Sequence, residues 1–357
     1  MKAIHFIGIL LLGMTPALMA QPLRVGVAGL NHDHVRGLMD NYKKGRVIIL
    51  GIAEPDAQLA QKYKQAYQLP DSIFFSSVGA MLEHIHPEVV LAYNAISDHL
   101  SVVEVCAPKG ISVMVEKPLA TTVKQADRIA SLADQYHIRV LTNYETTWYA
   151  SNQRLYEMAH RQQAIGTIRK MVARAGHQGP KEIGCSPDFL QWLTDPEKNG
   201  GGALIDFGCY GADLMTWFED GKAPIAVTAV TRHYKPTVYP KVDDDATILL
   251  EYPDATGLIQ ASWNWPYGLK DLEVFGQTGR LYAANGHSLE ERIKDSTTQV
   301  ELKPTYADNL PYLAAVLRGE IQPGIDLSSL EINRIVVQIL EAARRSAKEG
   351  KRIRIQE

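Results

Sequence analysis

The chain has 357 residues, of which 46% are hydrophobic and 22% are charged. This length suits two domains of about 100–200 residues each, and the composition is that of a globular protein rather than a disordered or collagen-like one. Lysine and arginine (37) are balanced by aspartate and glutamate (40), so no basic excess is available to neutralise phosphates, which argues against nucleic acid as a partner.

Residues 1–20 have the pattern of a secretory signal peptide. Lys2 precedes an apolar run over residues 4–14, and small residues follow it up to Ala20. The run is about half as long as a bilayer span, and no later stretch reaches the ~20 apolar residues that a span needs. We therefore predict cleavage after Ala20 and an exported protein, periplasmic or secreted, with an uncleaved anchor as the alternative.

Residues 21–144 alternate short apolar runs with helical patterns, which is typical of a parallel sheet with crossover helices. Strands are predicted over residues 24–29, 47–53, 73–75, 89–93, 112–115 and 139–141. Helices are predicted over residues 32–44, 56–66, 77–85, 99–108 and 122–136. This pattern predicts a doubly wound Rossmann domain, in which ligands bind beyond the carboxyl ends of the strands.

Residues 145–357 have longer alternating strand patterns separated by turns. Strands are predicted over residues 223–234, 246–252, 257–265 and 272–275. Helices are predicted over residues 148–162, 203–218, 307–318 and 328–348, the last one stopping at Gly350. A second α/β domain with a large, mostly antiparallel open sheet and helices on one face fits best.

The turn after the first predicted strand holds part of a dinucleotide-binding fingerprint. Gly29 occupies the first glycine position, whereas Asn31 and His34 occupy the other two. Asn31 can adopt the left-handed conformation, so a tight turn survives, but His34 adds bulk where the helix would approach the strand. Gly29, Asn31 and His32 are candidate cofactor contacts, and a plain strand-to-helix turn is the alternative.

Glu54 ends the second predicted strand, where an acidic residue usually accepts hydrogen bonds from an adenosine ribose. A carboxylate there would repel a 2′-phosphate, so we predict NAD in preference to NADP. A solvated charge at the strand end is the alternative.

Two further segments carry candidate catalytic residues. The strand that ends at Glu116 runs into Lys117 at its carboxyl end, where an ammonium group could hydrogen-bond a substrate oxygen. The glycine-rich segment 200–213 places Asp206 and Tyr210 at positions i and i+4, on one face of the predicted helix. A carboxylate and a phenol facing a lysine from the other domain would form a proton-transfer site.

The ordered set of motifs resembles the glucose-fructose oxidoreductase, inositol dehydrogenase and MocA family of NAD(P)-dependent oxidoreductases. These motifs span residues 94–99, 116–120, 200–213, 242–244, 274–279 and 346–351. The resemblance covers nearly the whole mature chain. It implies a Rossmann domain, a second domain whose open sheet serves substrate binding and packing into a dimer or tetramer, and hydride transfer between a sugar or cyclitol carbon and nicotinamide.

The resemblance assigns Lys117 to binding and polarising the reacting oxygen, and Asp206 and Tyr210 to the acid–base positions. Many relatives have histidine where Tyr210 stands. A free phenol has a pKa of about 10, so we expect a nearby cation such as Lys117 to lower it. The alternative is that Tyr210 only packs and Asp206 only caps the helix.

The resemblance also places Asn94 and His99 near the nicotinamide ribose and phosphates, with a loop hydrogen bond as the alternative for each. Glu116 is expected to contact the cofactor or to brace its loop. His32 and His34 have no third ligand within reach in the sequence, so no metal site is predicted.

Aromatic and polar side chains of the second domain suit a small sugar or glycoside. His177, Trp148 and Trp192 are the candidate substrate contacts, with core packing as the alternative for each. His177 is favoured because it follows a predicted strand in a glycine-rich segment. Three cysteines form no disulfide framework, although a bridge between Cys185 and Cys209 stays open.

An exported chain that folds after translocation meets little free dinucleotide, so we expect it to hold its cofactor tightly. Three functions are compatible with the sequence. The first is an oxidoreductase acting on a secondary alcohol or ketone of a sugar or glycoside. The second is an NAD-dependent, redox-neutral glycoside hydrolase or lyase, and the third is a non-catalytic sugar-binding relic.

Overall fold

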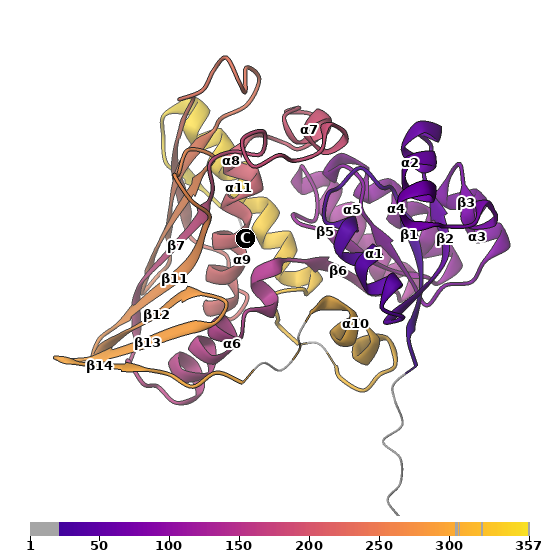
Figure 1. Cartoon of the computed structure of the whole chain (residues 1–357). Helices are drawn as coiled ribbons and strands as arrows, with labels where there is room; N and C mark the ends of the chain where they lie inside the picture. Colours follow the sequence, from indigo (N-terminus) through magenta and orange to yellow (C-terminus); the bar gives the residue numbers. More distant parts are fainter. Residues whose placement is uncertain (1–20, 304–305, 307, 323, 356–357) are drawn as a thin grey trace, which may run out of the picture.

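A six-stranded parallel sheet forms the first part of the computed structural model (Figure 1). The structure describes residues 21–303, 306, 308–322 and 324–355, so the predicted signal peptide lies outside the described residues. The strand order β3-β2-β1-β4-β5-β6 is that of a doubly wound Rossmann domain, as predicted. Its strands are β1 (Leu23–Ala28), β2 (Val47–Ala53), β3 (Phe74–Phe75), β4 (Val89–Ala92), β5 (Ser112–Glu116) and β6 (Val140–Asn143).

Five α-helices connect these strands at almost the predicted positions: α1 (Val35–Lys43), α2 (Ala57–Tyr67), α3 (Val78–His84), α4 (His99–Cys106) and α5 (Val123–Tyr136). The side chains of Asp56, Ser77 and Thr122 accept backbone N–H groups and cap the first turns of α2, α3 and α5. Helix α1 begins three residues later than predicted, because the backbone N–H of His32 donates to the Tyr93 carbonyl of the neighbouring strand end.

The second sheet has nine strands in the order β14-β13-β12-β11-β7-β10-β9-β8-β15. All neighbouring pairs are antiparallel except β7 and β10, so the prediction of a mostly antiparallel sheet is confirmed. The strands are β7 (Ile168–Gly176), β8 (Ala226–Arg232), β9 (Asp245–Glu251), β10 (Thr256–Ser262), β11 (Leu269–Gly276), β12 (Gly279–Asn285), β13 (Ser288–Ile293), β14 (Ser296–Gln299) and β15 (Ile353–Arg354).

Helices α9 and α11 pack on the face of this sheet that is turned towards the first domain (Figure 1). Every residue of α9 is buried. The helices after the first domain are α6 (Ala150–Tyr156), α7 (Pro187–Leu193), α8 (Ala203–Asp206), α9 (Gly208–Phe218), α10 (Asn309–Leu317) and α11 (Leu330–Glu349). The shorter helices of the chain are η1 (Asp71–Ile73), η2 (Ile96–Asp98), η3 (Ala107–Lys109), η4 (Glu145–Trp148) and the π-helix η5 (Glu157–Arg161).

Helix α10 does not belong to the core of the second domain, although it falls within the predicted segment 145–357. Its side chains Leu310, Leu313 and Val316 are buried in the same apolar cluster as residues of β1 and α1. The chain therefore returns to the parallel sheet after strands β7–β14 and before it adds β15 to the large sheet. Within the described residues, no helix combines the length and the apolar content that crossing a bilayer requires.

Candidate active site

Lys117 and Asp206 form a buried ion pair between the two domains. Lys117 follows β5 directly, and its Nζ donates to Asp206 Oδ1 at 2.5 Å and to the Asp206 carbonyl oxygen at 2.9 Å. Both residues are less than a tenth exposed. The second carboxylate oxygen of Asp206 accepts the indole N–H of Trp263 at 2.9 Å. Both oxygens of this carboxylate are therefore engaged.

The glycine-rich entry explains how Asp206 reaches this position. A side chain at Gly202 would overlap the backbone carbonyl of Asp243, so only glycine permits this approach. The carboxylate of Asp243 accepts the backbone N–H groups of Gly202 at 3.0 Å and Leu204 at 2.7 Å. These bonds satisfy the first N–H groups of α8 and fix the short helix that ends at Asp206.

The predicted single helix over residues 203–218 is divided at Phe207, so α8 ends at Asp206 and α9 begins at Gly208. Tyr210 is nevertheless brought to the same place as Asp206, because its ring centroid lies 5.0 Å from Lys117 Nζ. The prediction of one uninterrupted helix face is wrong, whereas the three candidate catalytic side chains do converge.

Opposing effects act on the charges of the pair. Burial is the largest single effect and disfavours the charged form of each group, but the attraction between the two charges, the hydrogen bonds of the pair and further nearby charges together outweigh it. The pKa of Lys117 is therefore raised and that of Asp206 is lowered. Both groups are charged at neutral pH.

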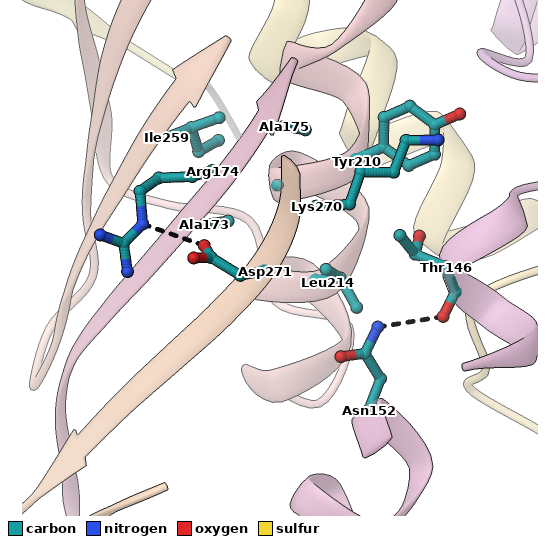
Figure 2. A pocket seen from close by; sticks show the side chains of 11 residues that line it. Thr146, Asn152, Ala173, Arg174, Ala175, Tyr210, Leu214, Ile259, Lys270 and Asp271 are labelled. Atoms are coloured by element: carbon teal, nitrogen blue, oxygen red, sulfur yellow. Dashed lines mark hydrogen bonds and ion pairs between the residues drawn. The ribbon is translucent and has the colours of Figure 1, made fainter. Parts of the chain in front are cut away.

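The ring of Tyr210 is faced by two ammonium groups, those of Lys117 and Lys270. Lys270 Nζ is 4.7 Å from its ring centroid, and Figure 2 shows the two side chains next to each other. Burial raises the pKa of Tyr210 well above its ordinary value, and the carboxylates of Glu145 and Asp206 raise it further. The expectation that Lys117 lowers this pKa is wrong, because the cations face the ring while burial dominates at the hydroxyl. The phenol is protonated at neutral pH.

His177 follows β7 and lies close enough to Asp206 and Lys117 for both charges to influence its pKa. Its Nδ1 accepts the backbone N–H of Gly179 at 2.9 Å, and its ring meets the edge of Phe207 at 4.8 Å between centroids. Burial lowers the pKa of His177. The neutral ring therefore carries its proton on Nε2, as assigned from this hydrogen bond.

A cavity of about 400 Å³ opens beside the carboxyl ends of β5 and β6. Its lining includes His34, Glu116, Asn143, Glu145 and Trp148. The Trp148 indole donates to Asn143 Oδ1 at 3.0 Å, and the Asn143 amide donates to Glu116 Oε1 at 2.9 Å. The pocket drawn in Figure 2, between Tyr210 and Lys270 and their neighbours, has only about 10 Å³, which is space for one water molecule.

The dinucleotide turn retains the first glycine for a physical reason. Gly29 has φ of +81°, and a Cβ there would lie 2.7 Å from the Cβ of Asn94. Asn31 is not among the residues with positive φ, so the predicted left-handed conformation is wrong. Both Asn31 Oδ1 and Asn94 Oδ1 are buried and have no hydrogen-bond partner among the described residues. These two acceptors fit a bound dinucleotide, whose ribose hydroxyls and carboxamide can donate to them.

Glu54 lies at the end of β2, as predicted, but its carboxylate is already engaged. Oε2 accepts the N–H of Leu30 at 2.8 Å, and Oε1 accepts the N–H of Asp56 at 2.9 Å. The residue is 8% exposed, and burial raises its pKa. A ribose hydroxyl that donates to Glu54 would therefore share the carboxylate with the backbone N–H groups of Leu30 and Asp56.

Helix α7 of the second domain packs on the dinucleotide turn. The Trp192 indole donates to the Asn31 carbonyl at 3.1 Å, and the Ser186 backbone N–H donates to Asp33 Oδ2 at 2.8 Å. The ring of His32 is buried against Phe189 and Trp192. The structure therefore joins Trp192 to the cofactor turn rather than to a substrate surface.

His32 and His99 are both buried side chains. His99 is 0% exposed, and its Nδ1 hydrogen-bonds the Leu119 carbonyl at 3.1 Å below the Lys117–Pro118 segment. Burial lowers the pKa of His99 to about 4, so the ring is neutral. The loop hydrogen bond named as the alternative for His99 is therefore present. All three cysteines, Cys106, Cys185 and Cys209, are free thiols.

Sequence reasoning did not select Lys270 as a site residue, and it did not predict Trp263 as a hydrogen-bond partner of Asp206. Lys270 lies near the start of β11 and has no motif around it, so only the fold brings it to Tyr210. Trp263 follows β10, and only its contact with Asp206 distinguishes it from a core tryptophan.

Two family models match this chain. Residues 23–144 match the oxidoreductase family with an NAD-binding Rossmann fold, and residues 153–282 match the GFO/IDH/MocA C-terminal domain. Among solved structures, the aldose-aldose oxidoreductase from Caulobacter crescentus has a TM-score of 0.79 at 20% identity, over 94% of this chain and all of that chain. An inositol dehydrogenase homolog from Azotobacter vinelandii, complexed with NAD+, has a TM-score of 0.80 at 17% identity, over 94% of this chain and 98% of that one. Identities this low show the fold alone.

Curated relatives include a trans-1,2-dihydrobenzene-1,2-diol dehydrogenase from Xenopus laevis, which is 24% identical over 57% of this chain and 57% of its own length. The rhizopine catabolism protein MocA from Rhizobium meliloti is 26% identical over 71% of this chain and 75% of its own length. The first family model covers the segment that forms the parallel sheet, and the second covers most of the segment that forms the nine-stranded sheet. The chain belongs to the GFO/IDH/MocA family of oxidoreductases.

Proposed function

We propose that this protein is an NAD-dependent oxidoreductase that interconverts a secondary alcohol and a ketone on a sugar or glycoside. The observation that carries the proposal is the buried pair of Lys117 and Asp206 at the carboxyl edge of the parallel sheet. A charged lysine held in a desolvated crevice can stabilise negative charge on a reacting oxygen.

Lys117 is the proposed oxygen-binding residue. An ammonium group has three N–H donors, and the two hydrogen bonds of Lys117 Nζ within the described residues both go to Asp206. The third N–H is available to the oxygen on the carbon that is oxidised or reduced. Asp206 fixes the direction of that donor and, through Trp263, is itself held in place.

Tyr210 is the proposed proton donor to the ketone oxygen in the direction of reduction. Its raised pKa keeps the proton on the hydroxyl at neutral pH, which suits a general acid. In the direction of oxidation only the phenolate form of Tyr210 can accept the proton of the alcohol, so the phenol must first release its own proton to solvent. His177, with its proton on Nε2, is the proposed hydrogen-bond donor to a neighbouring hydroxyl of the substrate.

NAD would be held by the turn at Gly29, by the unpartnered oxygens of Asn31 and Asn94, and by Glu54. When bound, it accepts or returns the hydride. Glu54 supports NAD over NADP, because a second negative charge beside this carboxylate is unfavourable. Glu116 and Trp148 line the adjoining cavity and would contact the nicotinamide half or the substrate.

Retention of the cofactor is part of the proposal. Trp192 of α7 and its N-cap Ser186 contact Asn31 and Asp33 of the dinucleotide turn, and we expect these contacts to slow the release of a bound dinucleotide. Slow exchange suits an exported enzyme that meets little free NAD, and export itself follows from the predicted signal peptide. We also expect a homodimer or tetramer that uses the open face of the nine-stranded sheet.

The test is to purify the mature protein, denature it and identify the released small molecules by mass spectrometry. We expect NAD or NADH in a ratio close to one per chain. The native protein is then incubated with a panel of sugars, polyols and glycosides while the absorbance of reduced nicotinamide is followed. Lys117→Met should abolish the absorbance change that wild-type protein gives with an active substrate.

Two other outcomes would replace the proposal. Release of an aglycone without net change in nicotinamide absorbance would show the redox-neutral hydrolase or lyase. Sugar binding that survives Lys117→Met, in a protein that releases no dinucleotide, would show a binding protein.

A further inference from the structure

Two histidines of the dinucleotide turn meet a carboxylate from β5. The potential ligand atoms of His32, His34 and Glu116 all lie within 4.8 Å of one another. His34 Nδ1 is 2.8 Å from Glu116 Oε2, and the two imidazole rings are 4.5 Å apart between centroids. His34 occupies the third glycine position of the fingerprint, and the redox proposal gives it no role.

We propose that His32, His34 and Glu116 bind one divalent transition-metal ion, with Zn²⁺ as the probe of choice. Two imidazoles and one carboxylate form a donor set that borderline metals such as zinc prefer. Three protein ligands leave at least one coordination position open, which is the arrangement of catalytic rather than structural zinc sites. The ion would replace the direct contact between His34 and Glu116.

The cluster combines one partly exposed ligand, His34, with two buried ones, His32 and Glu116. The side chain of His34 is 44% exposed and that of Glu116 only 2% exposed, so His34 can adjust while Glu116 stays in place. Glu116 is held by the Asn143 amide on its other oxygen, and a hydrogen bond of this kind orients a ligating carboxylate. His32 is fixed by Phe189 and Trp192.

Metal binding also involves the backbone of the turn. His32 Nδ1 accepts the His34 backbone N–H at 3.2 Å. A metal bound at this nitrogen would replace a long hydrogen bond, whereas a metal bound at Nε2 would displace a proton from that atom. The neighbouring charge of Lys117 opposes a cation, but Asp206 balances it at 2.5 Å.

The open coordination position would face the cavity of about 400 Å³, because His34 and Glu116 both line it. The lining also includes the carboxylate of Glu145, which could accept a hydrogen bond from a hydroxyl ligand. The oxygen at the open position can come from a phosphate of the dinucleotide or from a hydroxyl of the sugar. In either case the ion would polarise or position an oxygen within this cavity.

The experiment measures binding, so its result is independent of the proposed redox activity. The mature protein, without a histidine tag, is treated with a chelator, dialysed and titrated with Zn²⁺ by calorimetry. Co²⁺ is titrated in parallel, because its visible spectrum reports coordination by nitrogen and oxygen. We expect one ion per chain, and a loss of affinity of more than about tenfold in His34→Ala and in Glu116→Gln.

The matched control is His86→Ala, because His86 is exposed and lies outside the cluster. It should bind both ions with wild-type affinity. Glu116→Gln retains the shape of the side chain, and thermal unfolding of each variant verifies that the fold is intact. Absence of stoichiometric binding to the wild type, or equal affinity in wild type, His34→Ala and Glu116→Gln, would overturn the proposal.

A second arm identifies the oxygen ligand. The Zn²⁺ titration is repeated with NAD present and, separately, with a sugar that the protein binds. Tighter Zn²⁺ binding with NAD alone would assign the open position to a phosphate, whereas tighter binding with sugar alone would assign it to a hydroxyl. Unchanged Zn²⁺ affinity with both ligands would overturn the assignment of an open position facing the cavity.

Discussion

Lys117 Nζ lies 2.5 Å from Asp206 Oδ1, and the two residues come from different domains. The bond therefore joins the carboxyl end of a Rossmann strand to a helix of the second domain. A buried ion pair stabilises a fold only while both partners are present, because one partner alone is an uncompensated buried charge.

Lys117→Met should abolish turnover and lower the free energy of unfolding by about 3–5 kcal/mol, because it leaves the Asp206 carboxylate buried and unpaired. Lys117→Met combined with Asp206→Asn should recover much of the lost stability without recovering turnover. Urea unfolding and the nicotinamide assay measure the two quantities. If the double variant regained activity, the oxygen-binding role of Lys117 would be disproved.

Tyr210→Phe should reduce the rate of ketone reduction by about 10²–10⁴-fold, which is the usual contribution of a general acid. The ring still faces Lys117 and Lys270, so we expect the free energy of unfolding to change by less than about 1 kcal/mol. The kcat for reduction and a urea unfolding curve test both parts. Full activity in Tyr210→Phe would leave the residue with a packing role only.

Gly202→Ala should prevent folding or reduce stability severely, because the added Cβ overlaps the Asp243 carbonyl and displaces α8 together with Asp206. Gly37→Ala is the matched control. Gly37 lies within α1, and a Cβ added there would meet no atom within 4 Å, so alanine should stabilise the protein by about 0.5–1 kcal/mol. Thermal unfolding of the two variants should shift in opposite directions.

Glu219 gives the fold a pH dependence away from the site. Burial raises the pKa of this half-buried carboxyl to about 7, against an ordinary value of 4.5, and Asp220 contributes while Lys222 opposes. A raised folded-state pKa in an acid means that the folded state holds its proton more tightly than the unfolded state does. The stability from this group is therefore present at low pH and lost as the pH rises through about 7.

Glu219→Gln should consequently be more stable than the wild type by about 1 kcal/mol near pH 8, a value that allows for the solvent access of this side chain. The difference should shrink as the pH falls from about 7 towards 4.5 and disappear about one pH unit below 4.5, where the carboxyl is protonated in the folded state and largely protonated in the unfolded state as well. Unfolding curves at several pH values test this. An equal difference at every pH would show that ionisation is not its cause.

The first domain could be predicted almost element by element, because its strands are buried on both faces and read as continuous apolar runs. Val89–Ala92, for example, is buried at every position. The outer strands of the second sheet could not be predicted in this way. All residues of β14 are exposed, so no apolar pattern marks the strand.

The candidate site was predicted to the extent that local motifs specify it. Lys117 and Asp206 each stand in a distinctive segment, and the fold brings them together. Trp192 was predicted to contact substrate, whereas its indole donates to the Asn31 carbonyl of the dinucleotide turn. The sequence could not indicate this contact, because the two residues are 161 positions apart. Glu116 is likewise distant in sequence from His34, by 82 positions. No spacing in the sequence could therefore indicate Glu116 as the third ligand of the proposed metal site.

Helix α10 contributes to the apolar core of the Rossmann segment from a distant part of the chain. Leu310, Leu313 and Val316 belong to the apolar cluster on one side of the parallel sheet, yet they follow strands β7–β14 of the large sheet in the sequence. A fragment ending at residue 144 would lack these three side chains. The nucleotide-binding half therefore has its full apolar cluster only when the carboxyl-terminal part of the chain is present.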